Sequence, residues 1–362
     1  MSRPAMLILE DGARFDGTGI GPDGLAEGEA VFFTGMTGYE EALTDPSYNG
    51  QLLVFCYPLI GNYGIDPSVR QHHRIVASGA ICKRITRHPS HWRSSSSLPD
   101  WLEESNVRAI EGIDTRALVT RLREEGTMRA ILAVGEHAIA AAPAALDRYR
   151  AKALGTPELV RAVSPPQTAG RGAGPLRVAL LNCGSKENIA ALTAAEGVEV
   201  FDMPFTASLA DVLALRPDGL LVSNGPGDPT ELTGVVTTLR AAIERRDLPT
   251  FGICLGHQLI ALALGARTYK MKYGHRGANQ PVQDVRSGEV MITAQNHGYA
   301  VDASTLPPDV EETMVNLNDG SNEGLRHRTL PVESVQFHPE ASPGPLDARA
   351  FFRRFVDVMR RG

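Results

Sequence analysis

One cysteine in this sequence has the surroundings of a catalytic nucleophile. Cys254 stands between Gly252 and Gly256, after an apolar run and before an apolar pattern typical of a helix. The two glycines lack the β-carbons that would collide where a strand turns sharply into a helix. A thiol at the start of that helix lies near the positive end of the helix dipole, which stabilises the nucleophilic thiolate. The N–H of Leu255 is then placed to donate to an oxyanion, although a buried structural cysteine would fit this motif equally well.

A histidine and a glutamate near the end of the chain supply the other groups that a thiol nucleophile needs. His338 and Glu340 follow Val332, Val335 and Phe337, which predict a strand that Pro339 ends. Residues two apart in an extended backbone point the same way, so Glu340 can orient the imidazole that accepts the thiol proton. His297 is a second candidate for the base, but it has no carboxylate two residues away and ranks behind His338.

The second half of the chain has the pattern that would position these residues. Strand-like apolar segments alternate with helical ones from Leu176 onward, at 177–181, 198–201, 219–223 and 249–252. This alternation predicts a doubly wound, largely parallel sheet covered on both faces, with its active site at the carboxyl ends of the strands. The Gly/Pro loop 224–229 follows the third strand, so it is placed to supply a second oxyanion donor beside Cys254.

The first half reads as a mixed α/β domain of short strands, turns and helices. We predict helices around 99–104, after an N-cap at Asp114, and in the Ala-rich stretch 138–145. The segment 35–48 is rich in turn formers, which is typical of a surface loop. The Pro- and Gly-rich stretch 164–175 indicates an interdomain linker. The predicted organisation is a first domain over 1–150, a linker over 151–175 and a second domain over 176–362.

Composition narrows the class of protein. The chain has 362 residues and a net charge of -6, which argues against nucleic acid or an anionic membrane as the main partner. It has no apolar run of membrane-spanning length and no signal-peptide pattern, so we expect a cytoplasmic protein. Its four cysteines form no C-x-x-C pair and have no histidine at ligand spacing, so we expect neither disulfides nor a metal site.

Taken together, these motifs resemble a known enzyme family. The second domain resembles a class I, triad-type glutamine amidotransferase through SNGPGDP at 223–229, GICLGHQ at 252–258, QNHGY at 295–299 and FHPE at 337–340. The first domain is similar to the N-terminal domain of the small subunit of carbamoyl-phosphate synthetase. That similarity runs through the segments 28–32, 36–39, 43–48, 61–64 and 112–116.

The resemblance implies a role for each matching residue. Cys254 would attack the side-chain amide of glutamine and form a γ-glutamyl thioester, with His338 as base and then acid and Glu340 as its orienting partner. Backbone N–H groups of Gly225 and Leu255 would form the oxyanion hole. Ser47 is the position that matches a glutamine-binding serine, which replaces the surface-loop interpretation of its segment. The implied glutamine-binding set is Ser47, Gly225, Gly227, Leu255, Gln258, Asn296, Gly298 and Tyr299.

The resemblance also implies a partner. A separate large subunit would receive ammonia and make carbamoyl phosphate from bicarbonate and ATP, for arginine and pyrimidine biosynthesis. We expect ATP and magnesium only in that partner. We expect no cofactor in this chain, which has no Gly-rich loop ending in Lys-Ser or Lys-Thr. Two alternatives are a glutaminase for a different synthase, which the first domain's motifs disfavour, and a regulatory subunit with a vestigial triad.

Overall fold

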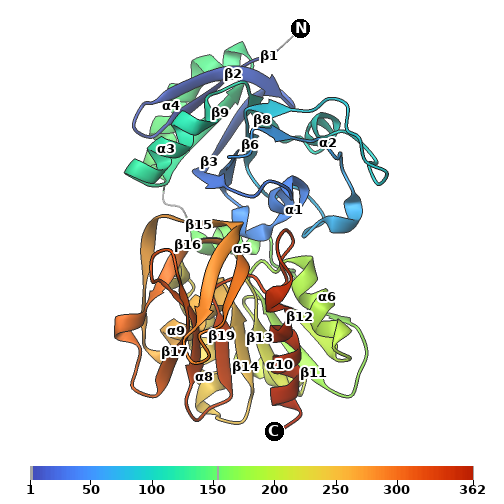
Figure 1. The fold of residues 1–362 in the computed structure, drawn as a ribbon, viewed down its shortest axis with the longest axis vertical. Coiled ribbons are helices and arrows are strands. Elements are labelled where there is room, and N and C mark those ends of the chain that lie inside the picture. The colour runs from blue at the N-terminus through green and yellow to red at the C-terminus, as the bar shows by residue number, and fades with distance from the viewer. Residues whose placement is uncertain (1–2, 153–154, 362) are drawn as a thin grey trace. The chain divides into compact units, whose positions relative to one another are not determined.

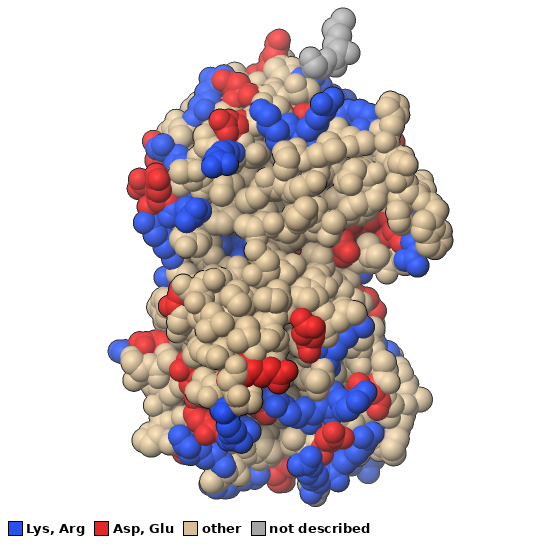
Figure 2. Space-filling model, viewed as in Figure 1, with Lys and Arg blue, Asp and Glu red and all other residues tan. Residues whose placement is uncertain are grey.

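The computed structural model describes residues 3–152 and 155–361. The chain divides into two compact units, Met1–Leu154 and Gly155–Gly362, which we call unit 1 and unit 2. Figure 2 shows acidic and basic side chains intermixed over the visible face of each unit. Within the described ranges, every helix is too short or too polar to cross a bilayer.

Unit 1 is built around a closed β-barrel (Figure 1). Among the described residues, seven strands close it in the order β1-β2-β8-β6-β4-β3-β9, and β9 pairs back onto β1. The β1–β2 pair is antiparallel, whereas β3–β4, β4–β6 and β6–β8 are parallel. The strands are β1 (Arg3–Leu9), β2 (Arg14–Ile20), β3 (Gly24–Phe33), β4 (Gln51–Phe55), β6 (Gly79–Ile81), β8 (Arg108–Glu111) and β9 (Met128–Val134), with a separate β5 (Leu59–Ile60) and β7 (Arg84–Ile85) pair.

The predicted helices of this unit are present. Ser97 caps α2 (Leu98–Glu104) by accepting from the N–H of Asp100, and Asp114 caps α3 (Thr115–Glu125) by accepting from that of Ala117. These side chains satisfy N–H groups that have no acceptor within the helix. The Ala-rich segment lies in α4 (Glu136–Ala151).

The surface-loop interpretation of 35–48 is wrong. The segment contains α1 (Tyr39–Thr44) and the 3₁₀ turn η1 (Pro46–Tyr48), and most of their residues are buried. Asp45 caps η1 by accepting from the N–H of Ser47 at 2.9 Å. Residues that favour turns also favour helix caps, so composition alone did not separate a loop from two short helical segments.

Unit 2 contains a sheet whose centre is parallel. Among its described residues the order is β10-β12-β11-β13-β14-β19-β18-β17-β15-β16, and neighbours from β12 to β19 run parallel. The parallel strands are β11 (Arg177–Asn182), β12 (Glu199–Pro204), β13 (Gly219–Val222), β14 (Thr250–Ile253) and β19 (Val332–Val335). The antiparallel extension comprises β18 (Asn322–His327), β17 (Val310–Asn316), β15 (Arg267–Asp284) and β16 (Val290–Asp302).

Helices cover both faces of the parallel centre, as predicted. Leu180 and its neighbours pack with α6 (Glu187–Ala195) and α10 (Ala350–Met359) in one apolar cluster. Leu181, pointing the opposite way, packs in a second cluster with α7 (Leu209–Ala214), α8 (Thr233–Glu244) and α9 (Leu255–Leu264). Successive residues of β11 are therefore buried on opposite faces, which explains its continuous apolar sequence. Short 3₁₀ turns complete the chain at η2 (Pro67–Val69), η3 (Pro229–Glu231), η4 (Ala303–Thr305) and η5 (Asp347–Arg349).

The stretch 151–175 holds more structure than a linker would. It contains α5 (Thr156–Arg161), with a proline in its first turn, and β10 (Ala169–Arg171), which pairs antiparallel with β12. Proline is tolerated at that helical position because the missing N–H has no intrahelical acceptor. Residues 153–154 lie outside the described part of the chain.

Removal of one aromatic ring should show how much α10 contributes to the stability of unit 2. Phe355 is fully buried, and its ring centroid lies 4.8 Å from that of Phe251 in β14. Phe355→Ala leaves a cavity between helix and sheet, so we expect the free energy of unfolding to fall by about 3–5 kcal/mol in denaturant titration. Leu346→Ala, at a 55% exposed position, is the control and should change it little. Equal effects would contradict this account of the core.

Candidate active site

Cys254 lies at a strained turn between β14 and α9. Its backbone angles are φ 54° and ψ -104°, a conformation that residues other than glycine rarely adopt. A β-carbon on Gly252 would lie 2.7 Å from the carbonyl of Gly256, and one on Gly256 would lie 2.3 Å from the carbonyl oxygen of Val222. The two glycines therefore permit the close approach of strand and helix that the turn requires.

The sulfur points toward the antiparallel extension of the sheet. Cys254 is 2% exposed, and its thiol donates to the carbonyl oxygen of Asn296 in β16 at 3.6 Å. The nucleophile predicted from β14 and the polar motif predicted at 295–299 therefore meet.

His338 and Glu340 form the expected pair, but the backbone differs from the prediction. His338 Nδ1 lies 2.6 Å from Glu340 Oε1, and both side chains are buried. However, β19 ends at Val335, and Glu340 lies in a turn rather than in an extended strand. The prediction that the two side chains share one face of a strand was therefore wrong. The turn folds the carboxylate back onto the imidazole, and the N–H of His338 donates to the carbonyl oxygen of Ala294 at 2.8 Å.

A lysine that the sequence analysis did not single out completes this group. Lys186 Nζ lies 2.9 Å from Glu340 Oε1, and the two side chains are 3% and 0% exposed. Its ammonium also donates to the carbonyl oxygen of Ala341, while its backbone N–H donates to Asn224 Oδ1 at 3.0 Å. Lys186 follows β11, so its place at the carboxyl end of a parallel strand was the signal that could have found it.

The charges in this group shift the pKa values of Glu340 and His338. Burial alone would raise the pKa of Glu340, but the Lys186 ammonium and His338 outweigh burial and lower it. Burial alone would lower the pKa of His338, but Glu340 and Cys254 outweigh burial and the opposing Lys186, and raise it. The imidazole of His338 is thus held in its protonated form at neutral pH.

The implied oxyanion donors lie beside the nucleophile. Leu255 is the first residue of α9, so its N–H has no acceptor within the helix. A β-carbon on Gly225 would lie 2.0 Å from the carbonyl oxygen of Cys183 and 2.9 Å from the Leu255 side chain. Gly227 has φ +96°, and a β-carbon there would collide with Thr156 of α5. The loop after β13 is thus packed closely against its neighbours in unit 2.

The remaining glutamine-binding candidates of unit 2 lie on α9 and β16. Gln258 donates through Nε2 to the carbonyl oxygen of Tyr299 at 2.7 Å and to Gln336 Oε1 at 3.0 Å, tying α9 to β16. Gly298 and Tyr299 are half-buried, and Asn296 is buried. Ser47 lies in unit 1, within η1, and its contact with glutamine stays a prediction.

His297, the alternative base, uses its ring nitrogens elsewhere. Nδ1 lies 2.8 Å from the carbonyl oxygen of Tyr299, and Nε2 lies 3.1 Å from Gln295 Oε1. Both contacts are within β16. In His338, by contrast, Nδ1 is held by Glu340, and among the described residues its buried Nε2 has no hydrogen-bond partner and can take up a proton. The geometry therefore favours His338 as the base.

Comparison with known proteins defines first a class and then a family. Residues 179–358 match the family model of class-I glutamine amidotransferases, and residues 7–132 match that of the carbamoyl-phosphate synthase small chain, CPSase domain. The carbamoyl phosphate synthase small chain of Symbiobacterium thermophilum is 47% identical over 98% of both chains. That of Akkermansia muciniphila is 46% identical over 97% of this chain and 96% of its own. The chain belongs to the family of carbamoyl phosphate synthase small chains.

A solved structure is also similar to part of the chain. It is a glutamine amidotransferase from Thermotoga maritima, with 17% identity and a TM-score of 0.37. The similarity covers 51% of this chain and 84% of that one.

Removing the Glu340 charge should shift the pH at which Cys254 reacts. The carboxylate raises the pKa of His338, so Glu340→Gln destabilises the imidazolium that interacts electrostatically with Cys254. We expect the rate of Cys254 alkylation by iodoacetamide, followed by peptide mass spectrometry, to rise with pH at a higher pH than in the wild type. Burial raises the pKa of Cys56 to about 11, so its peptide is an internal control that stays unmodified below pH 8. Superimposable profiles would contradict the assigned coupling.

Loss of the Lys186 charge should destabilise the fold most where Glu340 is ionised. Lys186→Met leaves a buried carboxylate with one of its cationic partners missing, so the free energy of unfolding should fall by about 3–5 kcal/mol at neutral pH. Because Lys186 and His338 lower the pKa of Glu340 to about 2, this difference should shrink as pH falls toward that value, where the wild-type carboxylate also takes up a proton. The exposed Lys272→Met is the matched control. A pH-independent difference would show that the ion pair is not its source.

Proposed function

We propose that this chain hydrolyses glutamine to glutamate and ammonia through Cys254, His338 and Glu340. The observation that carries the proposal is a buried group in which Lys186 Nζ lies 2.9 Å and His338 Nδ1 lies 2.6 Å from Glu340 Oε1, with Cys254 near enough to raise the pKa of His338. Its members follow β11, β14 and β19, at the carboxyl edge of the parallel strands. This is the arrangement of nucleophile, base and orienting group on which covalent acyl transfer depends.

The first half of the reaction forms a thioester. The Cys254 thiolate attacks the side-chain carbonyl carbon of glutamine, and the N–H groups of Leu255 and Gly225 stabilise the resulting oxyanion. His338 donates the proton from Nε2 to the leaving nitrogen, and ammonia departs as the tetrahedral intermediate collapses. Glu340 holds the imidazole through Nδ1 and stabilises its protonated form until that proton is transferred.

The second half releases glutamate. Neutral His338 takes a proton from water at Nε2, and the hydroxide attacks the thioester carbon within the same oxyanion site. Collapse of the second intermediate breaks the bond between carbon and sulfur, so the thiolate and the imidazolium are restored. The glutamine-binding set would be Ser47, Gly225, Gly227, Leu255, Gln258, Asn296, Gly298 and Tyr299.

Family membership supports a destination for the ammonia. A large subunit would receive it and form carbamoyl phosphate from bicarbonate and ATP, with ATP and magnesium bound by that partner in a cytoplasmic heterodimer. The product would serve arginine and pyrimidine biosynthesis.

A comparison of carbamoyl phosphate synthesis from glutamine with synthesis from added ammonia tests the proposed function. In the complex with the large subunit, Cys254→Ser should abolish carbamoyl phosphate synthesis from glutamine, because the weaker hydroxyl nucleophile cannot form the thioester at a useful rate. Synthesis from added ammonia should persist, since it bypasses this chain's chemistry. Cys183→Ser, at a buried cysteine after β11, controls for thiol loss as such. Equal loss of both activities in Cys254→Ser, or undiminished use of glutamine, would refute the proposal.

A further inference from the structure

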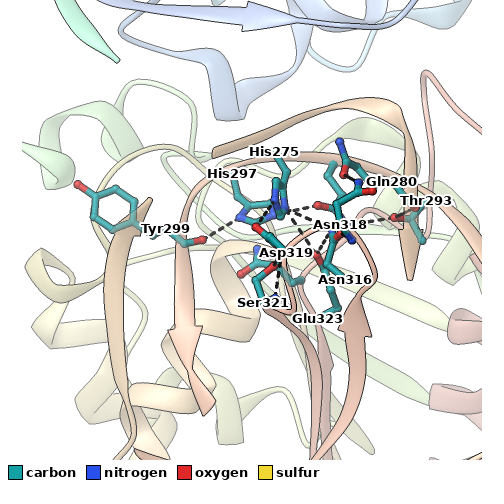
Figure 3. Close-up of polar contacts among 12 residues, drawn as sticks. His275, Gln280, Thr293, His297, Tyr299, Asn316, Asn318, Asp319, Ser321 and Glu323 are labelled. Atoms are coloured by element: carbon teal, nitrogen blue, oxygen red, sulfur yellow. Dashed lines mark hydrogen bonds and ion pairs between the residues drawn. The ribbon is translucent and has the colours of Figure 1, made fainter. Parts of the chain in front are cut away.

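A second group of buried ionisable side chains lies in the antiparallel extension of unit 2. It contains His275 of β15, His297 of β16 and Glu323 of β18, whose potential ligand atoms all lie within 4.8 Å of one another. All three side chains are buried, and the close-up in Figure 3 shows them gathered with Asn316 and Asp319. None of the three has a role in the proposed glutaminase chemistry.

Each histidine of this group is oriented as metal-binding histidines are. His275 Nε2 lies 2.9 Å from Asp319 Oδ2, and His297 Nδ1 lies 2.8 Å from the carbonyl oxygen of Tyr299. A ring that donates one N–H to a carboxylate or a carbonyl presents a lone pair at its other nitrogen. The other nitrogens are His275 Nδ1, which lies 3.7 Å from Glu323 Oε1, and His297 Nε2, which lies 3.1 Å from Gln295 Oε1.

At the centre of this group, acceptor atoms lie close together with too few N–H or O–H donors among them. His297 Nε2 lies 3.1 Å from Gln295 Oε1, which is an acceptor, and His275 Nδ1 lies 3.7 Å from Glu323 Oε1. Within the described residues, Glu323 Oε2 is buried and has no hydrogen-bond partner. Asn316 Nδ2 lies 3.0 Å from Glu323 Oε1 and 3.4 Å from His275 Nδ1, so its two N–H groups are directed to those acceptors. A cation among these atoms would remove both the acceptor–acceptor contact and the unpaired buried oxygen.

We propose that His275 Nδ1, His297 Nε2 and the Glu323 carboxylate bind a divalent transition metal of the zinc class, with Gln295 Oε1 as the fourth donor. Two imidazoles with oxygen donors suit Zn²⁺, whose bonds of about 2.0–2.2 Å place tetrahedral ligands roughly 3.3 Å apart. The distance from His297 Nε2 to Gln295 Oε1 is 3.1 Å and that from His275 Nδ1 to Glu323 Oε1 is 3.7 Å, both close to this value. Rotation of the Glu323 side chain would shorten the second distance. A set of four protein ligands defines a closed, structural site.

The site would cross-link three strands of the extension. β15, β16 and β18 are separate segments of the chain, and β16 carries Asn296, whose carbonyl oxygen accepts from the catalytic thiol. The metal would thereby fix the strand beside Cys254. Sequence spacing predicted no metal because the ligands stand on different strands, and only strand pairing brings them together. This inference does not rest on the proposed glutaminase activity.

Metal titration of the full-length chain tests the site. Cys254→Ser serves as the parent, so that the active-site thiol cannot bind the metal. After dialysis against a chelator, we expect Co²⁺ to bind with one ion per chain and to give the visible absorption of a tetrahedral site. Mass spectrometry of the zinc-loaded chain should give the same stoichiometry. Glu323→Gln and His275→Asn, added to that parent, should lose stoichiometric binding, and Asp319→Asn should weaken it about 10- to 100-fold.

A buried histidine outside the group provides the matched control. His327 of β18 pairs with Asp309 Oδ2 at 3.0 Å, and His327→Asn should leave metal binding unchanged. Thermal melts of every variant establish that it is folded, and Asp319→Asn, changed outside the ligand set, keeps the test valid if a ligand variant unfolds. Absence of one-per-chain binding in the folded parent would overturn the proposal. So would equal affinity in the parent and in folded Glu323→Gln or Asp319→Asn.

Discussion

The buried ion pair between Lys186 and Glu340 is the constraint on which the site depends. Two charges removed from water are tolerable only when each is closely compensated. Lys186 follows β11 and Glu340 lies beyond β19, with β13 and β14 between those strands in the sheet. The pair therefore joins the turns across the carboxyl edge of the parallel strands. Because Glu340 also meets the imidazole of His338, the same carboxylate that satisfies the lysine determines where the base lies.

The nucleophile is held by backbone geometry as much as by side-chain chemistry. Cys254 adopts its unfavourable φ and ψ because β14 and α9 are fixed by the clusters on the two faces of the sheet. Such strain persists only where the surroundings overdetermine it. The packing of β14 and α9 therefore holds the strained turn in place, and that turn positions the sulfur.

Much of this could be predicted from the sequence, and the misses have physical reasons. Alternating apolar segments predicted the parallel sheet of unit 2, and the motifs at Cys254, His338 and Glu340 named three groups that the structure brings together. Lys186 was missed because a single lysine in a turn has no periodic pattern around it. The pairing of His338 with Glu340 was expected from a strand, but a turn achieves it. Closure of the first domain into a barrel depends on pairing between distant strands, which local patterns do not encode.

Because several groups around the sulfur belong to the main chain, the positions near Cys254 differ in how well they tolerate substitution. The acceptor for the thiol is the carbonyl oxygen of Asn296, and the implied oxyanion donors are N–H groups, so the atoms that matter there survive a change of side chain. Gly225 is different, because any β-carbon would lie 2.0 Å from the carbonyl oxygen of Cys183. Glycine is therefore required at position 225 because there is no space for a side chain, and not because a side chain would take part in the chemistry. Substitution at Gly225 should be limited by the space available for a side chain. At Asn296 the carbonyl contact with the thiol does not limit it, because every residue supplies that carbonyl.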